Sequence, residues 1–401
     1  MFAQKVVAVL AVAGLAAAQT GTICSAPSVT INSAADASAL ANCATLAGDV
    51  IIGPSAGGVI NINGPQIVRG AFISENAGGL TSLGSTTITS IEKEFTLTNL
   101  TLLSTLSMST LKSVGSIKWS ALPAISALSF TAIVTKADSV LITNTFLSSL
   151  DGINLQTVAV LDINNNNRLK KFDTQVANVT QLLQIDSNGQ ALEVSFPNLI
   201  WAANATFRNA SSVSIPSLAV VNGSLGFYGN NFESIAAPNL TTVGSKSDGG
   251  AGGGIAFVAN SDLANISFPM LESVAGANQV ANNSKLAALE FPALSTVGGA
   301  IDFSGNFTTP LLPALTLVSG GFNIQSTNQI DCTTFDKQQK NAAILGVYTC
   351  KTTADAKSGV GSSTSSGSGS STTSRAAAAS YGINEAIAGV SVIGGLLQML
   401  L

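Results

Sequence analysis

Residues 161–172 read LDINNNNRLKKF, and four consecutive asparagines are unusual beside an apolar segment. Leu161 and Ile163 alternate with polar residues, which is the pattern of a short strand that buries one face. The turn that ends such a strand leaves backbone groups that need hydrogen-bond partners. An asparagine side chain both donates and accepts, so Asn166 is predicted to satisfy these groups. None of the four asparagines begins an Asn-x-Ser/Thr sequence, so N-glycosylation does not explain the run.

The same frame recurs along the chain, and Asn166 and Asn188 are 22 residues apart. It reads apolar-x-apolar-x-x-Asn at Leu161-Ile163-Asn166, Leu183-Ile185-Asn188, Leu225-Phe227-Asn230, Ile255-Phe257-Asn260 and Ile301-Phe303-Asn306. A second frame, Pro-x-Leu-x-x-Val, begins at Pro216, Pro238, Pro269, Pro292 and Pro313. Repeats of about 20–25 residues are typical of solenoids, in which each coil stacks on its neighbours.

These frames predict a ladder of stacked asparagines, one at the end of each strand. The predicted rungs are Asn144, Asn166, Asn188, Asn230 and Asn260, with Ala210 in an intervening slot. The 22-residue step from Asn260 also puts Asn282 in a rung position. The longer step before Asn260 contains the sequence SDGGAGGG, which is predicted to be a surface insertion. Turn chemistry without stacking is the alternative to the ladder.

Composition excludes several classes of function. The 401 residues include no histidine, which removes His-based triads, His metal sites and His general bases together. The net charge of −4 provides no basic surface for nucleic acid. Charged residues make up 9% and aromatic residues 5% of the chain, as expected for a repetitive β-rich protein of small side chains. We predict no catalytic residue, no metal site and no cofactor.

The two ends of the chain read as targeting signals. Lys5 precedes the apolar run Val6–Leu15, which predicts a signal peptide over residues 1–18, cleaved after Ala18. A Ser/Thr/Gly-rich stalk is predicted over residues 357–375, and a glycosylphosphatidylinositol (GPI) signal over 376–401, which would be removed. The lipid is predicted to attach at Ser374 or Ala376. Simple membrane spans at either end are the alternatives, and residues 19–356 are predicted to form the solenoid.

The four cysteines form two pairs that are local in sequence, Cys24 with Cys43 and Cys332 with Cys350. An even number of cysteines in a secreted chain favours disulfides over metal binding or catalysis. Local pairing is favoured among the three connectivities. Short capping helices are predicted near residues 34–43 and 333–343, where each pair would seal an open solenoid edge.

Three features together resemble one known group: LDINNNNRLKKF, the segment LIWAANATFRNASSVSIPSLAVVNGSLGFYGNN at residues 199–231, and the Pro-x-Leu-x-x-Val frames. The chain resembles the fungal GPI-anchored cell-wall organisation proteins of the extracellular-mutant and sporulation-specific group, which are related to receptor L-domains. The resemblance covers nearly the whole chain. It implies a leucine-rich-repeat-like all-β solenoid, a parallel β-helix with short capping helices. It also implies a cell-surface location, a role in wall integrity and no established catalytic residue.

A polysaccharide-cutting enzyme would need paired carboxylates on an outward face, about 5–10 Å apart. Asp162 and Asp186 are predicted to be diagonal neighbours there, but Arg208 follows one coil later and favours an ionised Asp186. Asp302 lies too many coils away to join them. A surface ion pair is therefore predicted. Trp119, Trp201 and Tyr228 are candidates for stacking on sugar rings, with ordinary packing as the alternative.

Nine sequons are candidates for N-glycosylation in a secreted protein: Asn99, Asn178, Asn204, Asn209, Asn222, Asn239, Asn265, Asn282 and Asn306. Asn282 and Asn306 also occupy predicted rung positions, and a buried rung cannot carry a glycan. Either the predicted register is wrong at those two coils or those two sequons are empty.

The predicted function is a non-enzymatic, GPI-anchored surface glycoprotein that supports fungal cell-wall organisation. The alternative is a glycosidase or transglycosylase of the wall built on a β-helix. Expected partners are wall polysaccharide or wall proteins, and the plasma membrane through the GPI lipid.

Overall fold

The computed structural model describes residues 22–245 and 252–353. The predicted signal peptide, stalk, GPI signal and attachment residues Ser374 and Ala376 lie outside this range, as does most of the glycine-rich insertion. The chain divides into two compact units, residues 1–134 and 135–401. Each unit is a parallel β-solenoid, which confirms the predicted fold class. The single solenoid domain over residues 19–356 stays a prediction.

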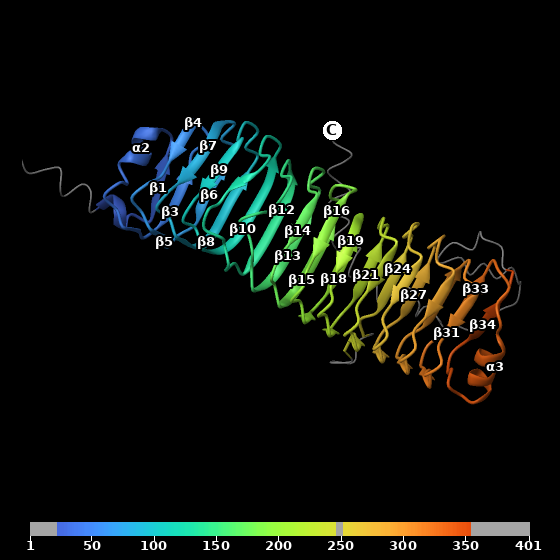
Figure 1. The fold of residues 1–401 in the computed structure, drawn as a ribbon. Helices are drawn as coiled ribbons and strands as arrows, with labels where there is room; N and C mark the ends of the chain where they lie inside the picture. The colour runs from blue at the N-terminus through green and yellow to red at the C-terminus, as the bar shows by residue number, and fades with distance from the viewer. Residues whose placement is uncertain (1–21, 246–251, 354–401) are drawn as a thin grey trace, which may run out of the picture. The chain divides into compact units, whose positions relative to one another are not determined.

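The first unit stacks parallel strands in rows, and the rows form the faces of the coils (Figure 1). Its longest row pairs β1 with β3, β3 with β6, β6 with β8 and β8 with β10. A second row runs β4–β7–β9–β11. The elements are β1 (Ser28–Ile31), α2 (Ala34–Ser38), β2 (Thr45–Leu46), β3 (Asp49–Ile52), β4 (Gly57–Asn61), β5 (Ile67–Val68), β6 (Phe72–Glu75), β7 (Gly79–Ser85), β8 (Ser90–Thr98), β9 (Thr105–Met108), β10 (Ser113–Leu122) and β11 (Leu128–Ser129).

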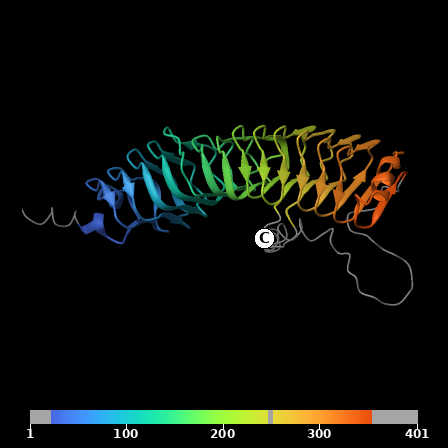
Figure 2. The same ribbon diagram turned by 90° about the horizontal axis from the view of Figure 1, so that it is seen from below.

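The second unit continues the same scheme through more coils, which Figure 2 shows side by side. Its main row pairs β12 with β13, then β15, β18, β21, β24, β27, β30, β33 and β34, all in parallel. The strands of this row are β12 (Ser139–Thr145), β13 (Thr157–Asn164), β15 (Asn178–Asp186), β18 (Ala205–Arg208), β21 (Leu225–Tyr228), β24 (Ile255–Val258), β27 (Asn278–Ala281), β30 (Ile301–Gly305), β33 (Phe322–Ser326) and β34 (Tyr348–Lys351).

Shorter strands of the second unit form the other faces of its coils. One row extends from β15 through β17 (Trp201–Ala202), β20 (Val220–Val221), β23 (Thr242–Val243), β26 (Ser273–Val274), β29 (Thr296–Val297) and β32 (Leu317–Val318). The remaining strands pair in small groups: β14 (Lys171–Asp173), β16 (Leu192–Ser195) and β19 (Ala210–Ser214); β22 (Ser234–Ala236) and β25 (Asn265–Ser267); β28 (Ala288–Glu290) and β31 (Thr309–Leu311).

The Pro-x-Leu-x-x-Val frame explains the first of these short rows. Each proline and its successor occupy a turn, and the frame's valine ends the two-residue strand that follows. The leucine and valine both point into the core, as Leu218 and Val221 show at 0% exposure. Proline suits the turn because its φ is fixed and it has no N–H to leave unpaired.

Aromatic rings stack along the core of the second unit. Phe207, Phe227 and Phe257 lie in register on consecutive coils, and their ring centroids are 5.5 and 5.1 Å apart. All three side chains are fully buried. Burying a phenylalanine side chain contributes about 1.5–3 kcal/mol, so this short stack is a substantial part of the packing between coils.

Both disulfides join the predicted local pairs, Cys24–Cys43 and Cys332–Cys350. Helix α2 lies between the first two cysteines and α3 (Thr333–Lys340) lies between the second two, as predicted. Ser33 caps α2 in a capping box with Asp36. The bridges span 19 and 18 residues, so each contributes ~3 kcal/mol in the loop-entropy model.

Candidate functional site

The asparagine ladder forms at the end of the main row of strands, as predicted for Asn166, Asn188, Asn230 and Asn260. All four side chains are 0–2% exposed. Each accepts a bond from the main-chain N–H of the coil before it; Asn188 Oδ1, for example, lies 3.0 Å from the Asn166 nitrogen. Each also donates from Nδ2 to a carbonyl of the preceding strand, as Asn230 does to Phe207 at 3.0 Å. The stacked-rung interpretation is therefore correct for these positions.

The rung prediction is wrong at Asn144, which is exposed. Its neighbour Thr145 is buried and occupies the slot, with its N–H 3.1 Å from Asn166 Oδ1. Threonine can fill the slot because its hydroxyl also donates to the same oxygen, at 2.6 Å. Asn144 has φ 53° and forms the turn instead.

The register is also one residue off at the Asn282 coil. Asn283 is buried, and its Oδ1 accepts from the Asn260 N–H at 3.0 Å, so Asn283 is the rung. Asn282 is exposed and has φ 58°. Asn306 is half-buried and donates to the Ser284 carbonyl at 2.6 Å, so it does not make the rung bond to the preceding strand. The conflict between rung and sequon thus disappears at Asn282.

A column of left-handed turn residues runs beside the rungs. In the second unit it comprises Asn144, Asn165, Ser187, Asn209, Gly229, Ala259 and Asn282, with φ between 53° and 58°. This conformation is costly for most side chains but tolerated by asparagine and glycine. It ends each strand and directs the chain into the rung, which explains why asparagines occur at both adjacent positions in the quoted run.

Side chains on the outward face of the main row form a connected group that we call the polar row: Thr143, Asp162, Asn164, Asp186, Arg208 and Tyr228. The Thr143 hydroxyl donates to Asn164, whose Nδ2 lies 2.7 Å from Asp162 Oδ1. Burial raises the pKa of Asp162, and the Asp186 charge adds to the rise, whereas the bond from Asn164 opposes it.

The other end of the polar row contains the predicted ion pair. Arg208 Nε lies 3.7 Å from Asp186 Oδ2, and both side chains are partly exposed. The same guanidinium lies 4.4 Å above the Tyr228 ring, and burial raises the pKa of Tyr228 to about 12. The ring lies over Gly226, where a Cβ would come within 2.3 Å of Tyr228 Cε2.

Asp302 lies apart from the polar row. It accepts bonds from Gln279 and Asn323 instead, at 3.4 and 2.8 Å. Of the aromatic candidates for sugar stacking, Trp119 is fully buried, which excludes it. Trp201 and Tyr228 are each partly exposed.

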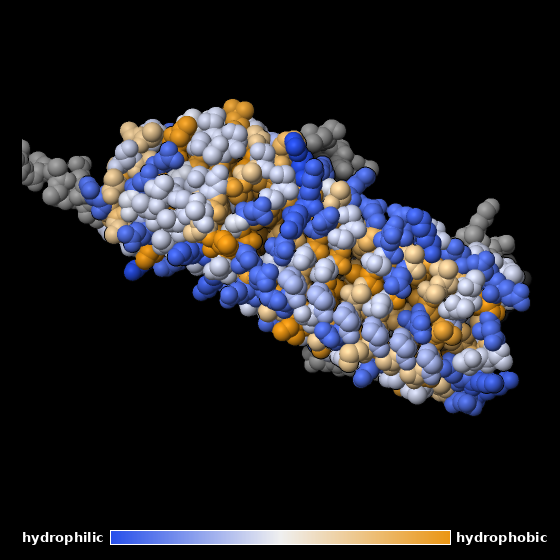
Figure 3. Space-filling model, in the orientation of Figure 1, coloured by the Kyte–Doolittle hydropathy of each residue, from blue (hydrophilic) through white to orange (hydrophobic). Residues whose placement is uncertain are grey.

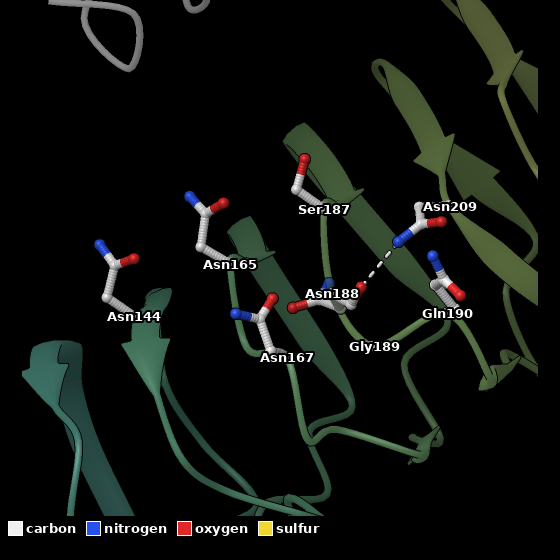
Figure 4. Close-up of a pocket in the computed structure, with 8 residues that line it drawn as sticks. All are labelled: Asn144, Asn165, Asn167, Ser187, Asn188, Gly189, Gln190 and Asn209. Atoms are coloured by element: carbon white, nitrogen blue, oxygen red, sulfur yellow. Dashed lines mark hydrogen bonds between the residues drawn. The ribbon is translucent and has the colours of Figure 1, made fainter. Parts of the chain in front are cut away.

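A polar hollow of about 610 Å³ adjoins the turn column (Figure 4). The amide hollow, as we call it, is lined by Asn144, Asn165, Asn167, Ser187, Gln190 and Asn209, and is completed by Asn188 and Gly189. This feature was not predicted from the sequence, because the hollow joins turn residues of several coils. The signal that could have revealed it is the recurrence of short polar residues at the turn position.

The nine sequons differ in accessibility. Asn99, Asn222, Asn239, Asn265 and Asn282 are exposed, and Asn178, Asn204, Asn209 and Asn306 are half-buried. Glycosylation of any of them stays a prediction.

Within residues 22–245 and 252–353, no cluster of three or more acidic or cysteine side chains is arranged to hold a metal. No helix in the same described ranges is long and apolar enough to cross a membrane.

Hydrophilic residues run between the apolar ones on the face that Figure 3 shows. Exposed large apolar side chains of the second unit include Ile200, Met270 and Leu311. A fold of stacked coils with disulfide-bonded ends and a polar outward row defines the class of leucine-rich-repeat-like solenoid proteins.

Comparison with known proteins identifies the group within this class. Protein ecm33 of Aspergillus fumigatus is 43% identical over 343 residues, covering 84% of each chain. A cell surface GPI-anchored protein of Arthroderma benhamiae is 38% identical over 347 residues, covering 86% of each. Cell wall mannoprotein PST1 of Saccharomyces cerevisiae is 35% identical over 329 residues, covering 80% of this chain and 71% of PST1. No family model and no solved structure matches.

The chain belongs to the fungal Ecm33 family of GPI-anchored cell-surface and cell-wall proteins. This confirms the resemblance found in the sequence and the cell-surface location that it implied. The relatives carry names of surface and wall proteins and none of these names is that of an enzyme.

Proposed function

We propose that this protein supports the organisation and integrity of the fungal cell wall as a surface glycoprotein, without catalysing a reaction. The observation that carries the proposal is that both carboxylates of the polar row are already bonded to neighbouring side chains. Asp186 is paired with Arg208 at 3.7 Å, and Asp162 accepts a bond from Asn164 at 2.7 Å. Each carboxylate is thus engaged by a neighbouring side chain of the polar row and has a structural role without any substrate.

The partners in this account are wall polysaccharide or other wall proteins, and the membrane contact is made by the GPI lipid. The Ser/Thr/Gly-rich residues 357–375 would hold the solenoid away from the membrane as an extended stalk. The lipid would attach at Ser374 or Ala376 after removal of the tail.

One observation favours the rival function, a glycosidase or transglycosylase of the wall. The raised pKa of Asp162 beside a second carboxylate is a feature of glycosidase acids. Asp162 and Asp186 are diagonal neighbours on adjacent strands, because Asp162 pairs with Gln184 and Asn164 pairs with Asp186. Diagonal neighbours are ~7–8 Å apart, which lies within the spacing of inverting enzymes.

Two experiments test the proposal: the first separates the two functions, and the second tests the need for the anchor. Incubation of the purified full chain with β-1,3-glucan, β-1,6-glucan and chitin should release no new reducing ends and form no longer products. Turnover of any of the three that disappears in the Asp162→Asn variant would establish the rival. In cells, deletion of Ala386–Leu401 should release a folded protein into the medium and reproduce the wall defect of a full gene deletion.

A further inference from the structure

We propose that the amide hollow is a binding site for an uncharged pyranose sugar. The inference rests on the proposed function, because it names the class of wall molecule that the second unit would contact. Every residue that lines the hollow is asparagine, glutamine, serine or glycine. The lining therefore combines hydrogen-bond donors and acceptors and carries no ionisable side chain.

This chemistry selects among possible ligands. Divalent cations are typically held by at least one carboxylate among their oxygen ligands, and anions by a cation or an aimed set of backbone N–H groups. Apolar small molecules bind in pockets that are lined mainly by hydrophobic and aromatic side chains, unlike this one. A sugar ring presents several hydroxyl groups that each donate and accept, and the two ends of an amide group match them.

The main chain holds the lining residues in place. Asn144, Asn165, Ser187 and Asn209 are the left-handed turn residues of four successive coils, with φ between 53° and 56°. Adjacent parallel strands are ~4.8 Å apart, so these side chains form a regular row along one rim. The buried rung Asn188 lies beneath this rim and is fixed by its bonds to Asn166 and Ile163. The backbone of the rim and the Asn188 side chain are therefore fixed before a ligand binds, which lowers the entropic cost of binding.

An exposed aromatic ring lies on the same coil as Asn144, which lines the hollow. Phe146 follows Asn144 by two residues and is 40% exposed. The guanidinium of Arg168 lies 4.3 Å from the centroid of its ring. Phe146 follows the slot residue Thr145 as Asn167 follows the rung Asn166 one coil later. An exposed ring on this coil would suit the apolar C–H face of a sugar that extends from the hollow.

The sugar has two candidate sources. Asn209 begins the sequon Asn209-Ala210-Ser211, so the first sugar could be attached to the chain itself. The Asn209 Nδ2 lies in the hollow, 2.7 Å from the Asn188 carbonyl oxygen (Figure 4). The amide keeps one N–H after glycosylation, so this bond can persist. The other source is a separate wall polysaccharide.

The experiment uses the full chain, secreted from a fungal host, and three probes: β-1,3-linked glucose, β-1,4-linked N-acetylglucosamine and α-1,6-linked mannose oligosaccharides. Ser211→Ala removes the sequon and keeps the Asn209 side chain, with loss of one bond to the Leu192 carbonyl. Asn167→Ala with Gln190→Ala removes two exposed amides from the hollow. The matched control is Gln175→Ala with Asn198→Ala, an exposed amide pair outside the lining. Glycopeptide mapping reports occupancy of Asn209, and circular dichroism confirms folding.

If Asn209 is unoccupied, the unsubstituted protein should bind at least one probe. If Asn209 is glycosylated, Ser211→Ala should bind the probe and the unsubstituted protein should not, which assigns the hollow to the attached glycan. In either case, replacing Asn167 and Gln190 together by alanine should weaken probe binding roughly tenfold or more. The control double substitution at Gln175 and Asn198 should leave probe binding unchanged.

The proposal is overturned if the Ser211→Ala protein binds none of the probes, or if both amide pairs have equal effects. Failure here is distinguishable from failure of the proposed function. Failure of the sugar site appears in the binding of oligosaccharides to the purified protein. Failure of the proposed function appears in the wall defect of cells that lack the gene, which is measured without any probe.

Discussion

Asn188 Oδ1 accepts two hydrogen bonds from the neighbouring rung, one from the Asn166 N–H and one from Asn166 Nδ2, each at 3.0 Å. The Asn188 amide in turn donates to the Ile163 carbonyl at 2.8 Å. One buried side chain thus satisfies three polar groups of the preceding coil, which lets the strand end without orphaned backbone atoms.

Asn188→Ala should lower the free energy of unfolding by at least ~1–3 kcal/mol, because it leaves buried donors and an acceptor without partners. Asn167→Ala should have almost no effect, because this side chain is exposed. Asn165 is a poorer control, since its φ of 54° would itself penalise alanine. Urea unfolding of both variants measures the difference, and equal losses would refute the stacked-rung account.

Asn278→Ile should stabilise the protein by ~1–3 kcal/mol. Asn278 is 0% exposed, and neither Oδ1 nor Nδ2 has a hydrogen-bond partner. Its partners in register on the adjacent strands are Ile255 and Ile301, so isoleucine suits the site. Asn278→Ala removes the same polar group but leaves space, and should gain less. A lower stability of the isoleucine variant in urea would show that the amide is satisfied in solution.

Asp162→Asn should stabilise the protein at pH 7 and have less effect at pH 3. The native pKa of Asp162 is raised above the ordinary value of 3.8, mainly by burial. The stability that follows from a raised pKa is fully present below about pH 3.8 and is lost as pH rises through the native pKa. An asparagine cannot ionise, so the variant avoids this loss.

The pH series needs a control for the removal of one negative charge. Asp151→Asn serves, because Asp151 is exposed. Urea midpoints from pH 3 to pH 8 should separate the Asp162 variant from the unsubstituted protein progressively as pH rises. A constant difference across this range would contradict the burial account.

The sequence predicted the repeat well because its signals are local. Apolar residues two apart specify a strand with one buried face, as Leu183 and Ile185 do in β15. The Pro-x-Leu-x-x-Val frame combines a turn with two buried positions, so its spacing carries both signals at once. The disulfides were predictable because each pair is close in sequence and flanks a short helix.

The rung register was harder to predict because two adjacent positions both favour asparagine. The left-handed turn residue and the rung follow one another, and Asn282 and Asn283 fill both. Spacing alone chose Asn282, one residue too early. At Asn144 the true rung was hidden because Thr145 makes the bond with a hydroxyl instead of an amide.

The amide hollow could not be predicted, because it depends on how turns of successive coils align. Asn144, Ser187 and Asn209 are far apart in sequence, and only the stacking register brings them to one rim. The pairing of Asp186 with Arg208 was predictable, since one coil separates them. The raised pKa of Asp162 was not, because it depends on burial.

The most direct test of wall support without catalysis is the stress resistance of cells that carry Asp162→Asn and Asp186→Asn together. The growth of these cells on a chitin-binding dye is compared with that of three other strains: cells with the unsubstituted protein, cells with the full gene deletion, and cells whose protein lacks Ala386–Leu401. The amount of the protein at the surface of each strain is measured by labelling. The account predicts that the double variant reaches the surface and grows like unsubstituted cells, whereas the two deletions are sensitive. A double variant that reaches the surface in normal amounts and is as sensitive as the full deletion would contradict it, and would assign the polar row to an enzyme that acts on wall polysaccharide.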